Sequence, residues 1–519
     1  MNMHIHIYAF RFLSILALTA MLACNKSISN ATASLPSLTP ANEDLNAGSW
    51  KTILLTRPDT FAVAAPAATT SPAYAADLNE IKGYQAHLTS DQLGQIKYWS
   101  AGGVLRWNET MRELVAKYNL PPYQLPNGTY PIPSSTNPFA YPLFPFSNPP
   151  YAARAYAYVS AAQYDALIAC WHYKTLYNRG APYTVDSTVK ALAGKTSLPS
   201  YPSEGAVLAG ATAEMMQLLF PDEIASIQTK LQQQEFSLIA SGAAAPSDVT
   251  AGEALGRQVA DVFIARGRAD NAGKAVGTPS IWASFVTTAE ANNQQPWISL
   301  ETPARPPMLP LFGAVKGFLV DSAAVVSLRP GPPPSTGSDS MKADVQAAYN
   351  TVKNATREQL SLVQFWADGV GTWTPPGHWD YIAAQDFIGQ NYSEVRWARN
   401  MALLNMAEMD AGIVCWSIKY YYFNPRPSDM DPTIRTLTGV PNFPSYVSGH
   451  AMFSSAAAAI LGYLIPARAQ AYATMAQQAA DSRVWSGIHY SIDCTTGATV
   501  GQNVGNYAVQ RAMIDGADQ

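Results

Sequence analysis

The spacing of apolar residues constrains the fold of this chain more than any other feature. Apolar residues recur every three or four positions over long segments, and no segment alternates between apolar and polar residues for long enough to indicate a β-strand. The spacing predicts helices over 78–86, 91–99, 105–118, 153–173, 204–219, 222–240 and 248–266, and again over 340–353, 357–368, 392–421, 449–464, 467–480 and 488–512.

Two proline-rich stretches, 121–150 and 305–334, interrupt this pattern. Proline has no backbone amide hydrogen and its φ is fixed, so a helix cannot continue through such a stretch. We therefore predict an all-α protein in which long proline-rich loops surround helical bundles. No repeat at a fixed period is apparent in the sequence.

The first residues have the features of an export signal. Arg11 precedes an apolar run over 12–23, which is too short for a permanent membrane anchor and ends at Cys24. Residues 22–24 resemble the end of a bacterial lipobox, although Met21 stands where leucine is usual. We predict a lipoprotein-type signal peptide over 1–24, lipidation of Cys24, and a place in the bacterial cell envelope, periplasmic or surface-exposed. An ordinary secretory signal, which would leave the protein secreted, is the alternative.

Composition divides the rest of the chain. Residues 25–75 are rich in Ser, Thr, Ala and Pro with little periodicity, which predicts a flexible tether. An N-terminal helical region over 76–335 and a C-terminal helical bundle over 336–519 would follow. No later segment offers the roughly eighteen uncharged apolar residues that a membrane-spanning helix needs. We therefore expect membrane contact only through the lipid anchor.

Charge and cysteine content exclude some classes of protein. The formal net charge is -4, and the chain lacks the basic surface that neutralises the phosphates of a duplex, so we expect no nucleic-acid partner. Past Cys24 only Cys170, Cys415 and Cys494 remain. An odd number cannot form a complete disulfide framework, although one bridge is possible.

Three segments near the C-terminus carry residue types that bind small anions. In the first, KYYYFNPRP, Lys419 and Arg426 are seven positions apart, so two cations can reach one anion from different directions. In the second, FPSYVSGHA, Ser448 occupies an N-cap position before Gly449 and His450. The free amides and the positive end of that helix dipole favour an anion. Taken singly, each segment could equally be a solvated helix end or a plain N-cap.

The third segment, SRVWSGIHYSID, contains Arg483, His489 and Asp493. If a helix begins near residue 488, His489 and Asp493 share one face, and the carboxylate can accept from one ring nitrogen. The other nitrogen is then free to act as a nucleophile or a ligand. Only five histidines follow Cys24, and two of them stand beside three cations in these segments. That conjunction favours a single oxyanion pocket over unrelated structural roles.

Together the segments resemble the signature of the type-2 phosphatidic acid phosphatase and vanadium-dependent haloperoxidase superfamily, in particular its soluble haloperoxidase-like branch. The signature reads K-x6-RP, PSGH and SR-x5-H-x3-D. Every interval agrees between Lys419 and Asp493, with Val447 in place of the proline of PSGH. The resemblance implies two packed helical halves, of which the C-terminal one holds the pocket.

The resemblance also implies a role for each residue. Three cations would balance the charge of the oxyanion, and a hydroxyl and an amide would hydrogen-bond it: Lys419, Arg426 and Arg483, and Ser448 and Gly449. His489 would be the covalent or vanadium-coordinating residue. His450 would be the acid–base residue, and Asp493 would orient His489.

Outlying residues favour the haloperoxidase branch. Phe443 and Trp416 resemble its aromatic pocket wall, and Trp416 shares a helical face with Lys419. The segment 364–383, QFWADGVGTWTPPGHWDYIA, resembles the same branch. In it Asp368 is a candidate partner for Arg426 or Arg483, and His378 is either a pocket residue or a packed loop histidine.

We therefore predict an enzyme that binds vanadate and oxidises a halide with hydrogen peroxide. The alternative is a soluble acid phosphatase that would use His489 as a nucleophile on a phosphate ester and would need no cofactor. A second alternative is an inactive oxyanion-binding or scaffold protein.

Overall fold

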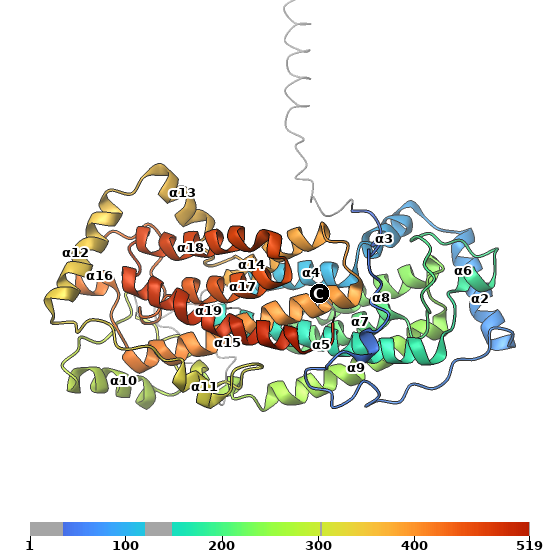
Figure 1. Cartoon of the computed structure of the whole chain (residues 1–519), viewed down its shortest axis with the longest axis horizontal. Coiled ribbons are helices and arrows are strands. Elements are labelled where there is room, and N and C mark those ends of the chain that lie inside the picture. The colour runs from blue at the N-terminus through green and yellow to red at the C-terminus, as the bar shows by residue number, and fades with distance from the viewer. Residues whose placement is uncertain (1–34, 120–147, 302–303, 518–519) are drawn as a thin grey trace, which may run out of the picture.

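The computed structural model describes residues 35–119, 148–301 and 304–517. These residues form the predicted all-α fold, and within them the only β-type pairing is one isolated bridge between Gly180 and Pro199. Figure 1 shows the helices along one long axis. They are α2 (Pro72–Ala86), α3 (Ser90–Ser100), α4 (Gly103–Tyr118), α5 (Pro149–Tyr177), α6 (Pro182–Val185), α7 (Glu204–Leu219), α8 (Ile224–Ala240), α9 (Pro246–Arg268), α10 (Pro279–Ala291), α11 (Ser322–Ser327), α12 (Asp339–Lys353), α13 (Arg357–Phe365), α14 (Thr374–Ile388), α15 (Glu394–Tyr422), α16 (Pro427–Met430), α17 (Gly449–Leu464), α18 (Ala469–Trp485) and α19 (Ser491–Met513).

Two 29-residue helices, α5 and α15, form the centre of the molecule. The side chain of Asn148 caps α5 and that of Ser393 caps α15, each by accepting a hydrogen bond from an amide in the first turn. Each helix ends at a residue with left-handed φ, Asn178 and Phe423. Most of their residues are buried on every side, which is typical of a core helix.

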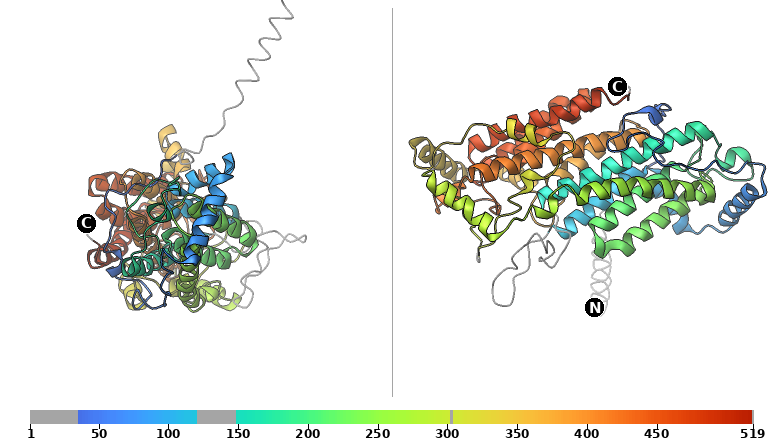
Figure 2. Two further views of the ribbon diagram at one scale, coloured as in Figure 1. Left: turned by 90° about the vertical axis from the view of Figure 1, so that its right-hand side faces the viewer. Right: turned by 90° about the horizontal axis from the view of Figure 1, so that it is seen from below.

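One continuous hydrophobic core runs through both halves of the molecule. Helices α7 and α9 pack on α5, and α8 packs on α7; in the same way α17 and α19 pack on α15, and α18 packs on α17. Figures 1 and 2 show the two groups following one another along the long axis. Within each group small residues permit close contact, since a Cβ on Gly501 of α19 would stand 2.4 Å from the carbonyl oxygen of Met452 on α17.

The two halves are a structural repeat, contrary to the expectation that no repeat is present. Adding 245 to the residue numbers turns the bounds of α5, α6, α7, α8 and α9 into those of α15, α16, α17, α18 and α19. Contacts repeat as well as bounds. The amide of Ser203 donates to the carbonyl of Asp248 at 3.0 Å, and the amide of Ser448 donates to the carbonyl of Asp493 at 2.9 Å.

A buried carboxylate marks the same place on each central helix. Asp165 on α5 accepts hydrogen bonds from the amides of residues 53–55. Asp410, 245 residues later on α15, accepts from the amides of residues 318–320. The second segment was assigned to the N-terminal region from the sequence, yet it packs on the C-terminal half. The boundary expected between the N-terminal helical region and the C-terminal bundle, at 335/336, stays a prediction.

The flexible tether expected over 25–75 is wrong for residues 35–71, which pack along the helical body. Trp50 is 1% exposed in the main core, and Asp44 forms a buried ion pair with Arg396 of α15. Such buried contacts fix the segment although its sequence has little periodicity. Residues 25–34 lie outside the described residues, as does the predicted signal peptide with Cys24.

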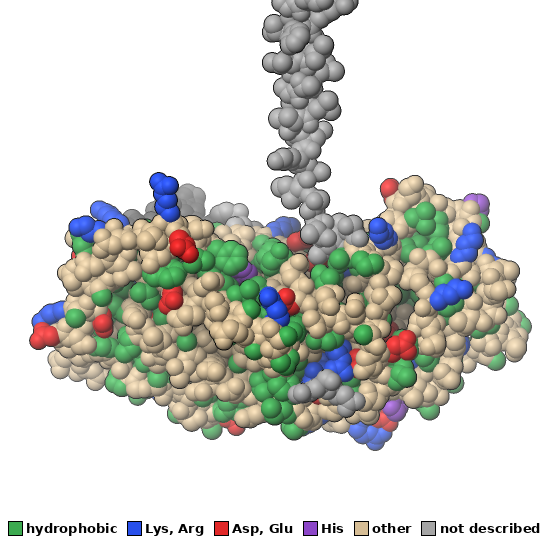
Figure 3. Space-filling model, turned by 45° about the horizontal axis from the view of Figure 1, so that its top comes forward, with side chains coloured by type: hydrophobic (Ala, Val, Ile, Leu, Met, Phe, Trp, Pro, Cys, Tyr) green, Lys and Arg blue, Asp and Glu red, His purple; other side chains and the backbone are tan. Residues whose placement is uncertain are grey.

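Helix α15 with its continuation, 394–430, is long and apolar enough to cross a membrane by length and composition. Of its most apolar window, 94% is buried inside the molecule, as in the core helix of a globular bundle. Cys170, Cys415 and Cys494 are buried free thiols. Figure 3 shows charged side chains scattered over one face rather than gathered in a basic patch.

Candidate active site

The three predicted segments meet at one end of the C-terminal half. They are brought there by the last turns of α15 and α18 and by the first turns of α16, α17 and α19 (Figure 1). The close packing of α17 on α19 fixes the two helix starts side by side. All eight residues predicted to hold the oxyanion or act on it belong to these five elements or to the residues just beside them.

Lys419 is fully buried near the end of α15. Its Nζ donates to the carbonyl oxygens of Pro444 at 2.8 Å and Ser445 at 2.9 Å. Burial, together with the positive charge of Arg426 and against the opposing effect of Cys415, lowers the pKa of Lys419 to about 8. Two neutral acceptors do not balance an ammonium charge, so this site gains by taking up an anion.

Arg426, the N-cap of α16, is also fully buried. Its Nε donates to the carbonyl of Phe443 at 3.0 Å and its Nη1 to that of Ile488 at 2.7 Å. The same Nη1 lies 3.2 Å from Nε2 of His489. Its Nη2 is buried and has no hydrogen-bond partner among the described residues. An unpaired guanidinium nitrogen is costly, so it points to a ligand with acceptor oxygens.

Arg483, in the last turn of α18, supplies the third buried cation. Its Nε donates to the hydroxyl of Ser482 at 2.9 Å and its Nη2 to the carbonyl of Val363 at 3.0 Å. Burial lowers the pKa of Arg483 to about 10, and Asp368 opposes that effect. A guanidinium keeps its charge at neutral pH, so three positive charges converge here.

The start of α17 provides the predicted turn. The hydroxyl of Ser448 accepts a hydrogen bond from the amide of Ala451 at 3.4 Å. The amide hydrogens of Gly449 and His450 find no acceptor among the described residues, as expected for the first turn of a helix. A Cβ on Gly449 would stand 3.9 Å from Phe453 and 4.0 Å from Trp416, which is ordinary contact. Val447, which departs from the signature, follows a cis peptide bond.

His489 is held by the carboxylate of Asp493, as predicted, but α19 begins at Ser491, so His489 precedes the helix instead of sharing a helical face with Asp493. Nδ1 of His489 lies 2.9 Å from Oδ2 of Asp493. That oxygen also accepts from the amide of Tyr490 at 3.2 Å and from the hydroxyl of Ser445. With Nδ1 engaged by a carboxylate, the other nitrogen, Nε2, faces Arg426 and carries the free lone pair.

Ser445 is a site residue that the sequence analysis missed. It lies 3.3 Å from Nδ1 of His489 as well as donating to Asp493. Its position three residues before the predicted N-cap Ser448, in a segment already assigned to the site, is the signal that could have identified it.

Asp368 was expected to pair with Arg426 or Arg483; it forms no ion pair with either among the described residues, although its charge raises the pKa of Arg483. Its Oδ1 lies 3.0 Å from Nδ1 of His378, and its Oδ2 lies 3.8 Å from Nε2 of His450. Both arginines receive acceptors from backbone carbonyls and a hydroxyl instead. Asp368 therefore bridges two histidines, and His378 is part of that group while its ring packs on Trp366 at 4.7 Å.

The two predicted aromatic residues form one wall behind the cations. The ring of Phe443 lies 5.0 Å from that of Trp416, from Nζ of Lys419 and from Cζ of Arg426. The face of an aromatic ring attracts cations. Trp416 stands behind it and donates to the carbonyl of Met308 at 3.1 Å.

Burial and the neighbouring cations both lower the pKa values of the two histidines. Burial lowers the pKa of His489 well below its ordinary value, and Arg426 and Lys419 lower it further. Burial and Arg483 do the same for His450. An anion bound among the cations would oppose these effects and raise both pKa values.

Among the described residues no group of three or more His, Cys, Asp or Glu side chains is arranged to hold a metal cation. Three cations, two histidines and two free helix amides form a donor set that suits a tetrahedral oxyanion instead.

Comparisons with known proteins match part of the sequence to a family model and the fold to a solved structure. Residues 400–512 match the model of the PAP2 superfamily, a range that contains every residue from Lys419 to Asp493. A structure described as the first bacterial vanadium-dependent iodoperoxidase shares the fold with a TM-score of 0.58 and 20% identity, over 80% of this chain and 98% of that chain. A holo-type bacterial vanadium-dependent chloroperoxidase aligns with a TM-score of 0.49 and 14% identity, over 74% of this chain and 96% of that chain. No curated protein matches the sequence. The resemblance predicted from the three segments is confirmed.

Proposed function

We propose that this chain, which resembles the PAP2 and vanadium-dependent haloperoxidase superfamily and shares its all-α fold, is a vanadate-dependent haloperoxidase. One observation carries the proposal: Lys419, Arg426 and Arg483 are buried around Nε2 of His489, and their charges have no carboxylate hydrogen-bonded to them at the site. Buried charges without partners are stable only when a ligand balances them.

The residues present fit vanadate. Nη2 of Arg426 and the amides of Gly449 and His450 are free to donate to its oxygens. Nε2 of His489 is free to hold its vanadium, because Asp493 fixes the proton on Nδ1. Bound vanadate would supply the activation of hydrogen peroxide toward a halide. The aromatic wall of Phe443 and Trp416 would keep that side of the site free of water.

His450 is suited to move the proton that this reaction needs. Its Nε2 has no hydrogen-bond partner among the described residues and lies 3.8 Å from Oδ2 of Asp368, which also has none. The carboxylate can stabilise a protonated His450, while Arg483 opposes it. His450 is therefore neutral before the anion binds, and a bound anion, which raises its pKa, would let the ring take up and release a proton.

The match of residues 400–512 to the PAP2 superfamily supports a phosphatase as the second candidate. In that reaction Nε2 of His489 would attack phosphorus, the bond from phosphorus to the ester oxygen would break, and His450 would protonate the departing oxygen. Water would then release phosphate from His489. The three cations would stabilise the charge on the phosphoryl oxygens.

Two assays separate the candidates. Bromination of a phenolic dye that requires added vanadate, hydrogen peroxide and bromide supports the haloperoxidase. Hydrolysis of p-nitrophenyl phosphate that vanadate inhibits supports the phosphatase. If neither activity is found and His489→Ala retains oxyanion binding, the protein is an inactive binding or scaffold protein.

A variant of His450 tests the assignment of the acid–base role. His450→Ala is expected to abolish turnover while vanadium, measured by elemental analysis after dialysis, stays bound at one equivalent. His489→Ala is expected to lose the vanadium. Retained turnover in His450→Ala would show that another group moves the proton.

We also propose that the chain is anchored in the bacterial cell envelope through a lipid on Cys24, as the lipobox resemblance of residues 22–24 suggests. Metabolic labelling with a radioactive fatty acid should mark the wild type but not Cys24→Ala. An unlabelled wild-type protein in the culture medium would support an ordinary secretory signal instead.

A further inference from the structure

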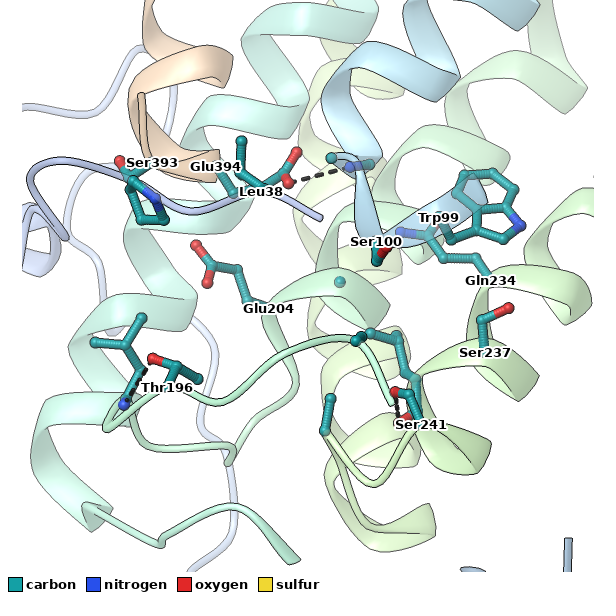
Figure 4. A pocket seen from close by; sticks show the side chains of 18 of the residues that line it. Leu38, Trp99, Ser100, Thr196, Glu204, Gln234, Ser237, Ser241, Ser393 and Glu394 are labelled. Atoms are coloured by element: carbon teal, nitrogen blue, oxygen red, sulfur yellow. Dashed lines mark hydrogen bonds between the residues drawn. The ribbon is translucent and has the colours of Figure 1, made fainter. Parts of the chain in front are cut away.

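The N-terminal half contains a cavity of about 230 Å³ far from the candidate active site. Figure 4 shows it between α7, α8, the start of α15 and the segment near Leu38. Its wall includes Glu394, the first residue of α15, whereas Lys419 is 25 residues further along the same helix. At 1.5 Å per residue the two are about 37 Å apart.

This cavity is the repeat counterpart of the oxyanion pocket. Trp171 and Leu198 in its wall lie 245 residues before Trp416 and Phe443 of the aromatic wall. Ser237 and Ser241 in the wall likewise lie 245 residues before Ser482 and Ser486. The first pair stands at the C-terminal end of α8 and the second at that of α18. Lys174, beside the cavity, corresponds to Lys419.

The counterpart has lost the groups that would hold an anion. Where the active half has Arg426, Arg483, His450 and His489, the N-terminal half has Ala181, Leu238, Gly205 and Ala244. The position of Gly449 is taken by Glu204, whose Oε2 pairs with Nζ of Lys174 at 3.1 Å. Its Oε1 accepts from the indole nitrogen of Trp171 at 2.8 Å. The protein's own carboxylate therefore neutralises Lys174, the counterpart of the only one of the three site cations that the N-terminal half keeps.

A second carboxylate, that of Glu394, is also compensated. It accepts hydrogen bonds from the amides of Gly103 and Val104 at the start of α4, where the helix dipole favours negative charge. Burial raises the pKa of Glu394 to about 7. Glu43, the third carboxylate in the wall, is partly exposed, so water screens its charge. The cavity thus offers acceptor oxygens with little uncompensated charge.

One buried donor completes the wall. Gln234 is 2% exposed, and its Oε1 accepts from the indole nitrogen of Trp107 at 2.7 Å. Its two amide hydrogens have no acceptor among the described residues, and Figure 4 shows the carboxamide beside Ser100 in the cavity wall. At this depth the amide hydrogens of Gln234 can find an acceptor only within the cavity, either water or a ligand.

The serine hydroxyls add acceptors rather than donors. Ser237 donates to the carbonyl of Gln233, Ser241 to that of Leu238 and Ser100 to that of Lys97. The lone pairs of Ser237 and Ser241 remain for a ligand, whereas Ser100 already accepts from the hydroxyl of Ser37 at 2.9 Å. A cation could use these acceptors but not Gln234, and an anion could use Gln234 but not the carboxylate and hydroxyl oxygens. A hydroxyl group both donates to carboxylates and accepts from an amide, so it suits both kinds of wall group.

We propose that this cavity binds a neutral, hydroxyl-rich molecule of monosaccharide or polyol size, at a site derived from the same ancestral pocket as the oxyanion site. Drug-sized ligands occupy pockets of about 300–1,000 Å³, so a cavity of about 230 Å³ suits a smaller compound. Trp99 and Trp171 supply the apolar part of the wall. The proposal does not depend on which reaction the C-terminal half catalyses.

The test is saturation-transfer NMR and calorimetry on the full chain with D-glucose, myo-inositol, tetramethylammonium and phosphate. At least one of the two polyhydroxylated compounds is expected to bind in the millimolar range or tighter. Tetramethylammonium is expected to bind at least tenfold more weakly. Phosphate is expected to bind only at the oxyanion site, so His489→Ala should lose phosphate binding. The same variant should bind the polyol as tightly as the wild type does.

Two variants locate the binding. Ala193→Trp fills the cavity from a loop in its wall and should weaken polyol binding at least tenfold. Gln234→Glu keeps an oxygen for Trp107 but removes the amide donor, and a fivefold or larger loss is expected. Gln233→Glu, which adds the same charge at the neighbouring position of α8 outside the cavity wall, is the control and should leave binding within twofold.

Three outcomes would overturn the proposal. The first is no polyol binding in a wild-type protein that is folded by circular dichroism. The second is polyol binding that Ala193→Trp leaves unchanged, which would put it elsewhere. The third is preferred binding of tetramethylammonium or phosphate that Ala193→Trp abolishes, which would make the ligand class wrong.

Discussion

Replacing Asp493 by asparagine isolates the charge that stabilises a protonated or ligand-bound His489. Oδ2 of Asp493 receives three donors, from His489, Ser445 and the amide of Tyr490. In Asp493→Asn the side-chain amide oxygen should occupy the position of Oδ2, because all three donors need an acceptor there. The proton of His489 then stays on Nδ1. The geometry is retained and the negative charge is lost.

The expected effect follows from the value of a hydrogen bond to a charged group. Such a bond contributes about 1.5–3 kcal/mol, against about 1 kcal/mol for a neutral pair. Burial excludes water from Asp493, which raises its pKa to about 6 and leaves no solvent to replace the lost charge. The difference between the two is about 0.5–2 kcal/mol, so at about 1.4 kcal/mol per tenfold change vanadate affinity should fall by roughly 2- to 25-fold.

The assay is calorimetric titration of the variant with orthovanadate at pH 7. Asp339→Asn is the matched control, because that carboxylate is 98% exposed at the start of α12. The melting temperature of Asp493→Asn should stay close to that of the wild type, since an amide oxygen can still cap α19. A change in affinity below twofold would refute the idea that the charge acts through His489.

Three further predictions concern buried charges. Glu408 is fully buried, and neither of its oxygens is hydrogen-bonded within the described part of the chain; its pKa is raised well above the ordinary value by burial and by Asp380. The contribution of Glu408 to folding stability is therefore highest below the unfolded pKa of about 4.3 and is lost as pH rises toward the folded pKa. Glu408→Gln should melt at a higher temperature than the wild type at pH 8 and at a similar temperature at pH 5. Because burial lowers the pKa of Lys419 to about 8, vanadate affinity should decline as pH rises above that value, and titrations of Lys419→Met across pH 7–10 should show a flatter profile. Arg483→Ala should weaken vanadate binding by about 1.5–3 kcal/mol at pH 7, and an unchanged dissociation constant would remove Arg483 from contact with the anion.

Helical periodicity predicted much of this fold because most helices keep an apolar face toward one core. The predicted range 204–219 coincides with α7, and 449–464 coincides with α17. Periodicity did not predict that the segment 35–71 is ordered. Its contacts are made by single buried residues, such as Trp50 and Asp44, which do not recur at a regular spacing. Tertiary contacts rather than local pattern hold such a segment.

The site shows a similar division between spacing and long-range contact. The intervals between residues 419 and 493 predicted one site for His489, Asp493 and the cations, because they match the signature of one superfamily. The partner of Asp368 depended on where α13 and α14 pack, which no local interval encodes. Consequently its pairing with His378 and its approach to His450 could be read only from the structure.

The repeat left signals in the sequence that are visible once the offset is known. The first is Cys170-Trp171-x2-Lys174 against Cys415-Trp416-x2-Lys419, and the second is PSYPSEGA over 199–206 against PSYVSGHA over 444–451. They escape notice because the residues between them have diverged and the period is nearly half the chain. Short identities at one large offset are weak evidence until helix bounds agree with them.

The repeat also divides the site residues into those that hold the fold and those that serve the ligand. Asp248, the counterpart of Asp493, accepts from the amide of Ala245 and so caps α9 just as Asp493 caps α19 through Tyr490. That contact is retained without any histidine to orient. The two arginines and two histidines are absent from the N-terminal half, although its helices have the same bounds. The fold therefore does not require those four residues, and the cost of burying Arg426 and Arg483 in the C-terminal half must be offset by what they bind.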